Sequence, residues 1–488
     1  MSSRILTFCL LSLAVACGGA QSIHVYQTTP DLTQALQPQT ELRFSAKAAS
    51  DAAAQAITVD DAKKFPEIDG FGASMTDSAA WLLAKKLPPA EREEAFKLLF
   101  ARKDGVAINI LRQPVGSSDL AVTFYSFDDL CEQSAKACTT PPGVADNNLE
   151  HFSIQHDQEY TLPLLRKALA INPAMHVMIS PWSAPGWMKS SGSMLGSNDE
   201  TKQNSSLRPE AYDAFANYLV KTIQGYQADG VPIYALTVQN EPLFGPPTYA
   251  GMQMLAEEQA KFFADSLGPA LARANLHPKV MAYDHNWDRP DYPETVLKDA
   301  KAGALAAGTA WHHYGGDPSV MTKNHEEFPQ KDQWVTESSG GAWQKGAVMA
   351  EEAGELIAVT RNWAKSYILW ALATDEKHGP IVGGCDTCRG LVTIDLTDPA
   401  SPSVKKELDY YVLGHASKFV LPGAVRIGSD EPANTPIKDV AFRNANGSIV
   451  VYTLNAGTAS QDVRVEARGK SFTTTIPAGS IATFVWKP

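Results

Sequence analysis

The sequence predicts an α/β fold, a (β/α)8 barrel with a side antiparallel β-sandwich domain, and three observations lead to it. Eight short runs of β-branched and aromatic residues recur between residues 67 and 373, with helical patterns between them. From about residue 405 onward, apolar and polar residues alternate between Asn-Gly and Ala-Gly turns. No glycine-rich phosphate loop follows the first run, which disfavours the alternative of a doubly wound sheet.

Residues 1–20 have the pattern of an export signal peptide. Arg4 supplies a positive charge, residues 5–16 form a compact apolar stretch, and small residues follow it. The stretch is too short to span a bilayer. A small-x-small cleavage site directly precedes Cys17, so a lipid anchor at Cys17 is the alternative to simple cleavage. We therefore expect a secreted or periplasmic protein without a transmembrane segment.

Residues 21–60 contain two candidate edge strands, SIHVYQTT and ELRFSAK, which we assign to the side β-domain. Residues 61–408 form the predicted catalytic barrel, and residues 409–488 return to the sandwich. The barrel is then an insertion between two parts of one β-domain.

The predicted barrel strands each end in polar or glycine-rich residues. They lie at residues 67–74, 106–116, 176–185, 234–242, 279–287, 308–314, 333–340 and 366–373. The clearest helical patterns, at 89–100 and 208–227, have apolar residues at three- and four-residue spacing and Pro near the start.

The composition excludes some classes of partner. The 488 residues carry a formal net charge of −12, which would repel a nucleic acid and is compatible with a neutral glycan. We expect a monomer with a carbohydrate substrate, no nucleic-acid partner and no cofactor.

Four cysteines follow the signal region, in two local pairs. In an exported protein, these pairs predict two local disulfides, one between Cys131 and Cys138 and one between Cys385 and Cys388. A zinc site is the alternative, but the pairs differ in spacing and lie in different loops. A thioredoxin-like interpretation of the C-x-x-C pair lacks the surrounding redox domain.

Polar side chains gather at the carboxyl ends of the predicted strands, where a barrel places its active site. Glu241 and Glu337 each end an apolar strand, a position where a carboxylate is costly unless it is functional. Glycoside hydrolysis needs such a pair, one carboxyl as a proton donor and the other as an ionised nucleophile. A separation of about 5–5.5 Å would predict retention of anomeric configuration.

Further residues at the same strand ends are candidate sugar contacts. Asn240 could hydrogen-bond the sugar 2-hydroxyl, Arg112 could keep Glu337 ionised, and Trp182 could stack on a sugar ring. Tryptophans at such positions are otherwise core residues. Adjacent His312 and His313 point to opposite faces of a strand, so a catalytic metal on both is disfavoured. The other predicted substrate-binding residues are Asp119, Asp284, His312, Tyr314 and Trp370.

From about residue 65 to its end, the chain resembles glycoside hydrolase family 30, which includes glucosylceramidases and endo-β-1,6-glucanases. The segments that carry the resemblance are IDGFGASMTDSAAWLL, ILRQPVGSSDL, ISPWSAPGWMK, TVQNEP, WHHY, VTESSGG and LGHASKFVLPGAVRIG. The resemblance implies a (β/α)8 barrel with a side β-domain. It also implies that Glu241 is the acid/base and Glu337 the nucleophile of a retaining enzyme.

One departure bears on specificity. Glucosylceramidases carry a Trp-Asn pair after strand eight, whereas here Ala371 follows Trp370 and a cysteine-bracketed loop comes next. We therefore expect an extracellular endo-β-1,6-glucanase, with a glucosylceramidase-like exo-β-glucosidase as the alternative. The alternative from another class is a non-catalytic carbohydrate-binding protein. An unrelated barrel hydrolase would use Asp375 or Glu376 in place of Glu337.

Overall fold

The protein is described by a computed structural model that covers residues 22–46, 54–130, 139–141, 143–197, 205–432 and 434–488. The predicted signal peptide, with Cys17, lies outside these residues. Cys131 and Cys138 also lie outside them, so the disulfide predicted between Cys131 and Cys138 is not among the bonds of the described structure and stays a prediction. Within the described ranges, no helix combines the length and the apolar character needed to cross a membrane.

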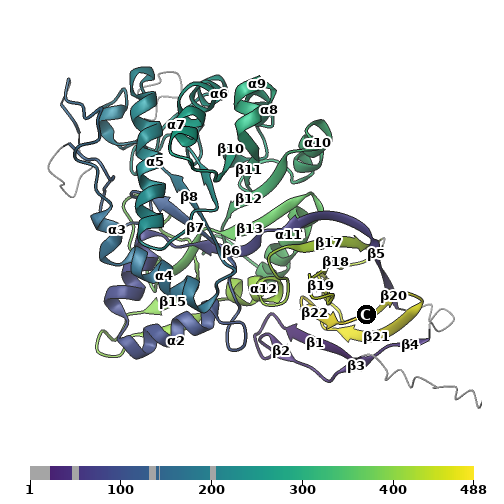
Figure 1. The fold of residues 1–488 in the computed structure, drawn as a ribbon. Helices are drawn as coiled ribbons and strands as arrows, with labels where there is room; N and C mark the ends of the chain where they lie inside the picture. Colours follow the sequence, from purple (N-terminus) through teal and green to yellow (C-terminus); the bar gives the residue numbers. More distant parts are fainter. Residues whose placement is uncertain (1–21, 47–53, 131–138, 142, 198–204, 433) are drawn as a thin grey trace, which may run out of the picture.

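Eight parallel strands close into a barrel, which confirms the predicted fold class (Figure 1). Each strand corresponds to one of the eight runs in the sequence. They are β6 Gly70–Ser74, β7 Ile110–Val115, β8 His176–Pro181, β9 Ala235–Thr237, β10 Lys279–Asn286, β11 Ala306–His312, β12 Asp332–Ser338 and β13 Ala364–Leu369. The ring closes where β13 pairs with β6.

Helical segments surround the barrel and connect consecutive strands (Figure 1). The α-helices are α1 Asp77–Trp81, α2 Pro89–Phe100, α3 Gln155–Glu159, α4 Thr161–Ile171, α5 Tyr212–Ala228, α6 Ala256–Phe262, α7 Gly268–Arg273, α8 Asp291–Lys298, α9 Ala300–Leu305, α10 Ser319–Glu327, α11 Val348–Arg361 and α12 Leu408–Ser417. Short π and 3-10 turns are η1 Leu82–Lys86, η2 Gly186–Met188, η3 Pro209–Ala211 and η4 Phe263–Leu267.

The inside of the barrel is a packed apolar layer and not a pore. Inward-facing side chains from seven of the eight strands fill it: Ile110, Met178, Ala235, Met281, Ala310, Trp334 and Ile368. On β6, a glycine is required for close approach, since a Cβ at Gly72 would lie 1.7 Å from the carbonyl oxygen of Ile110. Within the barrel, polar side chains therefore reach a solvent-accessible cavity only at the ends of the strands.

The side domain combines strands from both ends of the chain, as the sequence predicts. The strands are β1 Ser22–Thr28, β2 Gln37–Pro38, β3 Leu42–Arg43, β4 Ser45–Ala46, β5 Gln55–Ile68, β17 Ala424–Ser429, β18 Ile437–Arg443, β19 Ile449–Asn455, β20 Gln461–Ala467, β21 Lys470–Ile476 and β22 Ile481–Trp486. β1 pairs with β22, and β5 lies between β17 and β20 before the chain enters the barrel at β6.

The period-two pattern of these strands decides which face packs on the barrel. On β19, Ile449 and Val451 belong to the interior of the sandwich, whereas Val450, Tyr452 and Leu454 belong to the large core of the barrel. Helix α11 contacts β18 and β19, and α12 contacts β22. The two domains thus share an apolar interface.

A small three-stranded sheet follows β13. It consists of β14 Ala371–Asp375, β15 Gly390–Asp395 and β16 Ser403–Lys406. The loop between β14 and β15, residues 376–389, hydrogen-bonds to loops at the carboxyl end of the barrel: Val382 N–H donates to the Asp119 carbonyl, and the Thr248 hydroxyl to that of Gly383. This segment therefore forms part of the rim around the barrel mouth.

Candidate active site

A cavity of about 400 Å³ opens at the carboxyl end of the barrel. It is lined by predicted site residues together with residues that the sequence did not single out. The lining residues are Asp119, Trp182, Asn240, Glu241, Phe244, Tyr249, His285, Asn286, Tyr314, Glu337, Ser339, Trp343, Trp370, Cys385 and Cys388. Both predicted catalytic glutamates are among them.

The two glutamates approach each other across the cavity. Glu337 lies within β12, and Glu241 follows β9 with a left-handed φ of 48°. One carboxylate oxygen of each lies within 4.8 Å of the other. A non-glycine residue in the left-handed region is strained, and such strain persists where the surrounding structure fixes it, often at functional sites. The backbone N–H of Glu241 donates to the Asp284 carbonyl at 3.0 Å, which holds this conformation.

Arg112 on β7 lies directly beneath the glutamates with no solvent exposure. Its Nη1 donates to Glu337 Oε2 at 2.5 Å, and its Nη2 donates to Asn240 Oδ1 at 2.7 Å and to Asp284 Oδ2 at 2.8 Å. A fully buried guanidinium is stable only when paired, and here two carboxylates pair with it. Arg112 therefore fixes the carboxylate of Glu337 and supplies positive charge next to it.

Asp284 is a second fully buried carboxylate that organises the floor of the site. It accepts hydrogen bonds from the hydroxyls of Thr237 and Thr336, each at 2.6 Å, and it contacts His312 Nε2 at 3.0 Å. Tyr283 and Asp284 both have left-handed φ, 74° and 78°, at a register shift of β10. This irregularity turns the Asp284 side chain toward Arg112.

His312 connects the buried carboxylates to Glu241. Its Nδ1 lies 3.2 Å from Glu241 Oε1 and 4.0 Å from Glu337 Oε1. Burial lowers the pKa of His312, but the charge of Glu337 and the hydrogen bonds with Asp284 and Glu241 raise it to about 9. Burial raises the pKa of Glu241, whereas the hydrogen bond from His312 and the nearby positive charges, including that of Arg112, shift it below its usual value. At neutral pH His312 therefore carries the proton of this pair, and Glu241 is its ionised partner.

The predicted substrate-binding residues divide into two groups. Asp119, Trp182, Asn240, Tyr314 and Trp370 line the cavity. Arg112, Asp284 and His312 are not part of its lining; they are fully buried beneath it and contact the glutamates and Asn240. The second group therefore positions Asn240 and the two glutamates.

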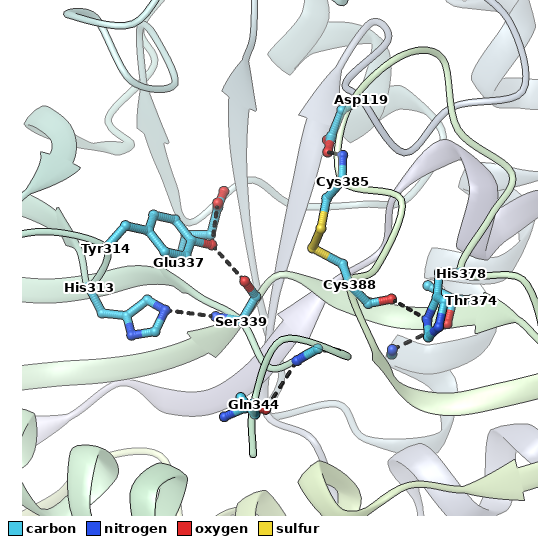
Figure 2. Close-up of a disulfide and its surroundings, with 12 residues drawn as sticks. Asp119, His313, Tyr314, Glu337, Ser339, Gln344, Thr374, His378, Cys385 and Cys388 are labelled. Carbon is cyan, nitrogen blue, oxygen red and sulfur yellow. Dashed lines mark hydrogen bonds between the residues drawn. A yellow bond between two sulfur atoms is a disulfide. The ribbon is translucent and has the colours of Figure 1, made fainter. Parts of the chain in front are cut away.

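Tyr314 and Ser339 hold the other side of Glu337. The Tyr314 hydroxyl donates to Glu337 Oε1 at 2.8 Å and lies 3.1 Å from the Ser339 Oγ (Figure 2). Together with Arg112, these contacts satisfy both oxygens of the Glu337 carboxylate. His313, next to His312, is not among the lining residues; its Nε2 accepts a hydrogen bond from Ser339 N–H at 3.2 Å (Figure 2), and its Nδ1 lies 2.8 Å from Glu355.

Two tryptophans form one wall. The rings of Trp182 and Trp370 lie 4.8 Å apart at 32°, and the Arg112 guanidinium lies 4.7 Å from the Trp182 ring. Both side chains are nearly buried yet line the cavity, so their edges can contact a sugar ring. Trp311 is a core residue instead, because it is fully buried and its Nε1 donates to Gln333.

Asp119 is joined to the rim by the cysteine loop. Cys385 and Cys388 form a disulfide, and the backbone N–H of Cys385 donates to Asp119 Oδ2 at 3.1 Å (Figure 2). A Cβ at Gly384 would lie 1.9 Å from the Cβ of Asp119, so only glycine allows this approach. Burial raises the pKa of Asp119 to about 7. The second oxygen, Oδ1, is buried without a partner in the described residues and is free to bind a sugar hydroxyl.

Of the two predicted disulfides, the structure confirms the one in this rim loop, between Cys385 and Cys388. The other predicted pair does not belong to the described site. Cys131 and Cys138 fall in residues 131–138, outside the described ranges, so neither Cys131 nor Cys138 is assigned a disulfide here.

Glu241, His312 and Glu337 are the one group of described residues whose donor atoms lie close enough together to hold a metal ion. The raised pKa of His312 argues against this use, since a protonated imidazole has no lone pair to offer. The buried Arg112 beside Glu337 also repels a cation. These side chains instead suit proton exchange between His312 and Glu241, next to the carboxylate of Glu337.

Neither alternative carboxylate after strand eight reaches the cavity. Asp375 accepts hydrogen bonds from the backbone of Lys377 and Gly379, and Glu376 accepts one from Leu396 N–H. Both act as local loop caps.

The sequence reasoning missed several lining residues on loops. Phe244 and Trp343 are each 48% exposed at the mouth, and Tyr249 lies nearby. The tryptophan in the loop segment GGAWQ, which follows Glu337 closely in the chain, is a signal that could have been used. His285 and Asn286, at the end of β10, complete the lining.

Comparison with known proteins agrees with this geometry. The profile of the glycosyl hydrolase family 30 TIM-barrel domain matches residues 68–420, and that of the family 30 β-sandwich domain matches residues 423–484. The chain belongs to glycosyl hydrolase family 30. It is therefore a glycoside hydrolase, as the motifs predicted.

Among curated relatives, the chain is 34% identical to an endo-1,6-β-D-glucanase of Neurospora crassa over 443 residues, 88% of each chain. It is 28% identical to the lysosomal acid glucosylceramidase of Mus musculus, over 88% of this chain and 83% of the relative. Among solved structures, the endo-β1,6-glucanase BT3312 superposes with a TM-score of 0.83 and 32% identity, covering 96% of this chain and all of the other.

Proposed function

We propose that this family 30 member is a secreted, retaining endo-β-1,6-glucanase in which Glu337 is the nucleophile and Glu241 the acid/base. The observation that carries the mechanism is the approach of the two carboxylates to within 4.8 Å. Inverting enzymes need a wider gap, about 6.5–9.5 Å, to admit a water between the sugar and the base. A narrow gap suits direct attack by a carboxylate.

In the first step, Glu337 attacks the anomeric carbon while the glycosidic bond breaks. A proton passes from Glu241 to the leaving oxygen, and the products are a glycosyl ester on Glu337 and a free sugar hydroxyl. Arg112 and the Tyr314 hydroxyl stabilise the ionised form of Glu337 before attack. The leaving oxygen does not develop a full negative charge because it departs protonated.

Glu241 receives its proton from His312. The pair shares one proton across the 3.2 Å contact between His312 Nδ1 and Glu241 Oε1. Transfer of that proton to the carboxylate makes Glu241 an acid when a leaving oxygen lies against it. In the second step, Glu241 accepts a proton from water, the hydroxide attacks the anomeric carbon, and Glu337 is released.

The substrate class rests on the relatives and on the rim. The Neurospora crassa relative and BT3312 are both endo-1,6-β-glucanases at more than 30% identity, above the glucosylceramidase of mouse. Ala371 stands where glucosylceramidases carry the Asn of a Trp-Asn pair, and the disulfide loop that follows brings Cys385 N–H against Asp119. The export pattern of residues 1–20 fits an extracellular enzyme. We expect it to act as a monomer.

Product analysis on β-1,6-glucan, glucosylceramide and an aryl β-glucoside, with Glu337→Ala as control, tests the proposal. We expect β-1,6-linked oligosaccharides from the wild type and none from the variant, with the β-anomer released first in proton NMR spectra. Glucose from the lipid or aryl substrate alone would assign a glucosylceramidase-like exo-enzyme. Initial release of the α-anomer would contradict retention, and an active Glu337→Ala variant would overturn the assigned nucleophile.

A further inference from the structure

A cavity of about 530 Å³ lies between the side domain and the barrel helices α10 and α11. Strands β5 and β17 contribute one side of its lining, and Thr322 of α10, Arg361 of α11 and Trp363 contribute the other. Trp363 stands at the amino end of β13, whereas Glu241 and Glu337 lie at the carboxyl end of the barrel. Among the described residues, none lines both this cavity and the active-site cavity. The cavity is therefore a separate candidate site.

Arg426 on β17 brings an unpaired positive charge to this cavity. The residue is only 5% exposed, and its guanidinium has neither an ion pair nor a hydrogen-bond partner among the described residues. Its Nε and Nη2 are enclosed by protein. Nη1 is not enclosed in this way, so it is the nitrogen that a ligand in the cavity can contact.

Two other arginines show how this protein stabilises a guanidinium that is removed from water. Arg112 and Arg389 each contact two carboxylates. A buried guanidinium without a carboxylate is costly, because it loses its hydration without gaining a partner. Burial and the nearby charge of Arg361 accordingly lower the pKa of Arg426 to about 9. An anion bound next to Arg426 would remove this cost.

Aromatic rings hold the guanidinium in place without pairing its charge. The centre of the Arg426 guanidinium lies 3.4 Å from the centroid of the Phe65 ring, so Phe65 covers one of its faces. The Trp363 ring meets that of Phe65 edge to face at 5.7 Å and stacks on His325 at 3.5 Å. Trp363 also has a left-handed φ of 76°, which is an outlier for so bulky a residue and is typical of ligand sites.

The other charges of the lining favour an anion that also carries hydroxyl groups. Lys63 and Arg361 add positive charge to that of Arg426, although Arg361 already donates to a carbonyl at the end of β17. Asp60 and Asp430 line the cavity as well, and a carboxylate there repels a second anion but accepts hydrogen bonds from hydroxyls. The lining therefore suits a molecule with one anionic group and several hydroxyls.

We infer that this cavity binds an oxyanion, the phosphate or carboxylate group of a small molecule, which pairs with Arg426 through Nη1. The Trp363 ring provides an apolar surface for the rest of the molecule, and Asp60 and Asp430 accept its hydroxyls. A sugar that carries a phosphate has all of these features. The site does not depend on the proposed glucanase activity. Because the ligand contacts residues of both domains, its binding stabilises the folded protein.

Calorimetric titration with glucose 6-phosphate, inorganic phosphate and glucose tests the inference. We expect both anions to bind the wild type and glucose to bind at least tenfold more weakly. Arg426→Met keeps a long side chain against Phe65 but removes the charge, so the Kd of both anions should rise about 10- to 100-fold, the loss of one charge-assisted hydrogen bond. A lower Kd for glucose 6-phosphate than for phosphate, with the difference lost in Trp363→Ala, would identify a sugar-borne anion. Equal values would identify free phosphate as the ligand.

Thermal unfolding without ligand separates this role from a structural one. Arg426→Met should unfold at the same temperature as the wild type or higher, because it removes an unpaired buried charge. The matched control is Arg166→Met, the same change at a partly exposed residue outside the cavity, which should leave the Kd of both anions unchanged. A wild type that binds neither anion, or an unchanged Kd in Arg426→Met, would overturn the inference. A clearly lower unfolding temperature of ligand-free Arg426→Met would assign Arg426 to the stability of the fold instead.

Discussion

The two ends of the same barrel each bury a cluster of charged side chains. The two clusters differ in hydrogen bonding and in backbone conformation. At the amino end, Asp69 accepts hydrogen bonds from the Tyr234 hydroxyl and the Trp334 indole, both at 2.6 Å. Lys365 lies 3.0 Å from Asp332 and 3.7 Å from Asp69. Among the described residues, none of these side chains has a buried polar atom without a partner.

The carboxyl end is organised differently. Asp119, His285 and Asn286 each have a buried polar atom without a partner in the described part of the chain, and Arg112 Nε is also unpaired. Glu241, Tyr283 and Asp284 have left-handed φ values, whereas no residue of the amino-end cluster does. A strained backbone and unpaired polar atoms at the carboxyl end are typical of a functional site. Paired charges at the amino end serve stability.

The largest expected effect that tests this contrast is on catalysis. Glu241→Gln removes the proton donor while keeping the size of the side chain, so kcat on the glucan should fall about 10²–10⁴-fold. The thermal unfolding midpoint should stay close to that of the wild type. An aryl glucoside with a good leaving group needs little protonation, so steady-state kinetics should show a smaller loss in its first step. Equal first-step losses on both substrates would contradict the acid/base assignment.

Asp69→Ala should produce the opposite result. It leaves Lys365 with one remaining carboxylate and deprives Tyr234 and Trp334 of their acceptor, so we expect a loss of about 3 kcal/mol in unfolding free energy. Denaturant titration measures this loss, and kcat at 25 °C should remain near that of the wild type. Asp332→Ala is the control, with a smaller loss because Asp332 is 36% exposed. A large fall in kcat for folded Asp69→Ala would remove the distinction between the two ends.

The same contrast shows how much the sequence could predict. The strands, the two glutamates and the cavity-lining Asn240 and Trp182 could be predicted, because residues at strand ends follow from the alternation of strands and helices. The place of Arg112 beside Glu337 could be predicted as well. The contacts of His312 with Glu241 and Asp284 depend on side-chain packing across several strands, which no local pattern encodes. Phe244 and Trp343 lie on loops whose path is set by tertiary contacts, so their place in the site could not be derived from spacing.

His312 gives the carboxyl end a pH dependence above neutral pH. The folded protein holds the His312 proton with a pKa of about 9, against 6.5 for an unperturbed histidine. Its stabilising contribution is therefore complete below about pH 6.5 and is lost as the pH rises through 9. Unfolding free energy measured from pH 6 to 10 should fall more steeply in the wild type than in His312→Gln. Parallel curves would show that His312 is neutral in the folded protein.

The smallest expected effect concerns the rim, where the Cys385–Cys388 disulfide bounds the site. It closes a loop of only four residues, so chain entropy predicts a loss of about 2 kcal/mol in stability when both cysteines become serine. The same change frees the Cys385 N–H that donates to Asp119, so KM on the glucan should rise by a few fold while kcat changes less. Reduction of the wild type with dithiothreitol should reproduce this change in KM. An unchanged KM in both experiments would mean that the Val382 N–H bond to the Asp119 carbonyl and the Thr248 hydroxyl bond to Gly383 hold the rim by themselves.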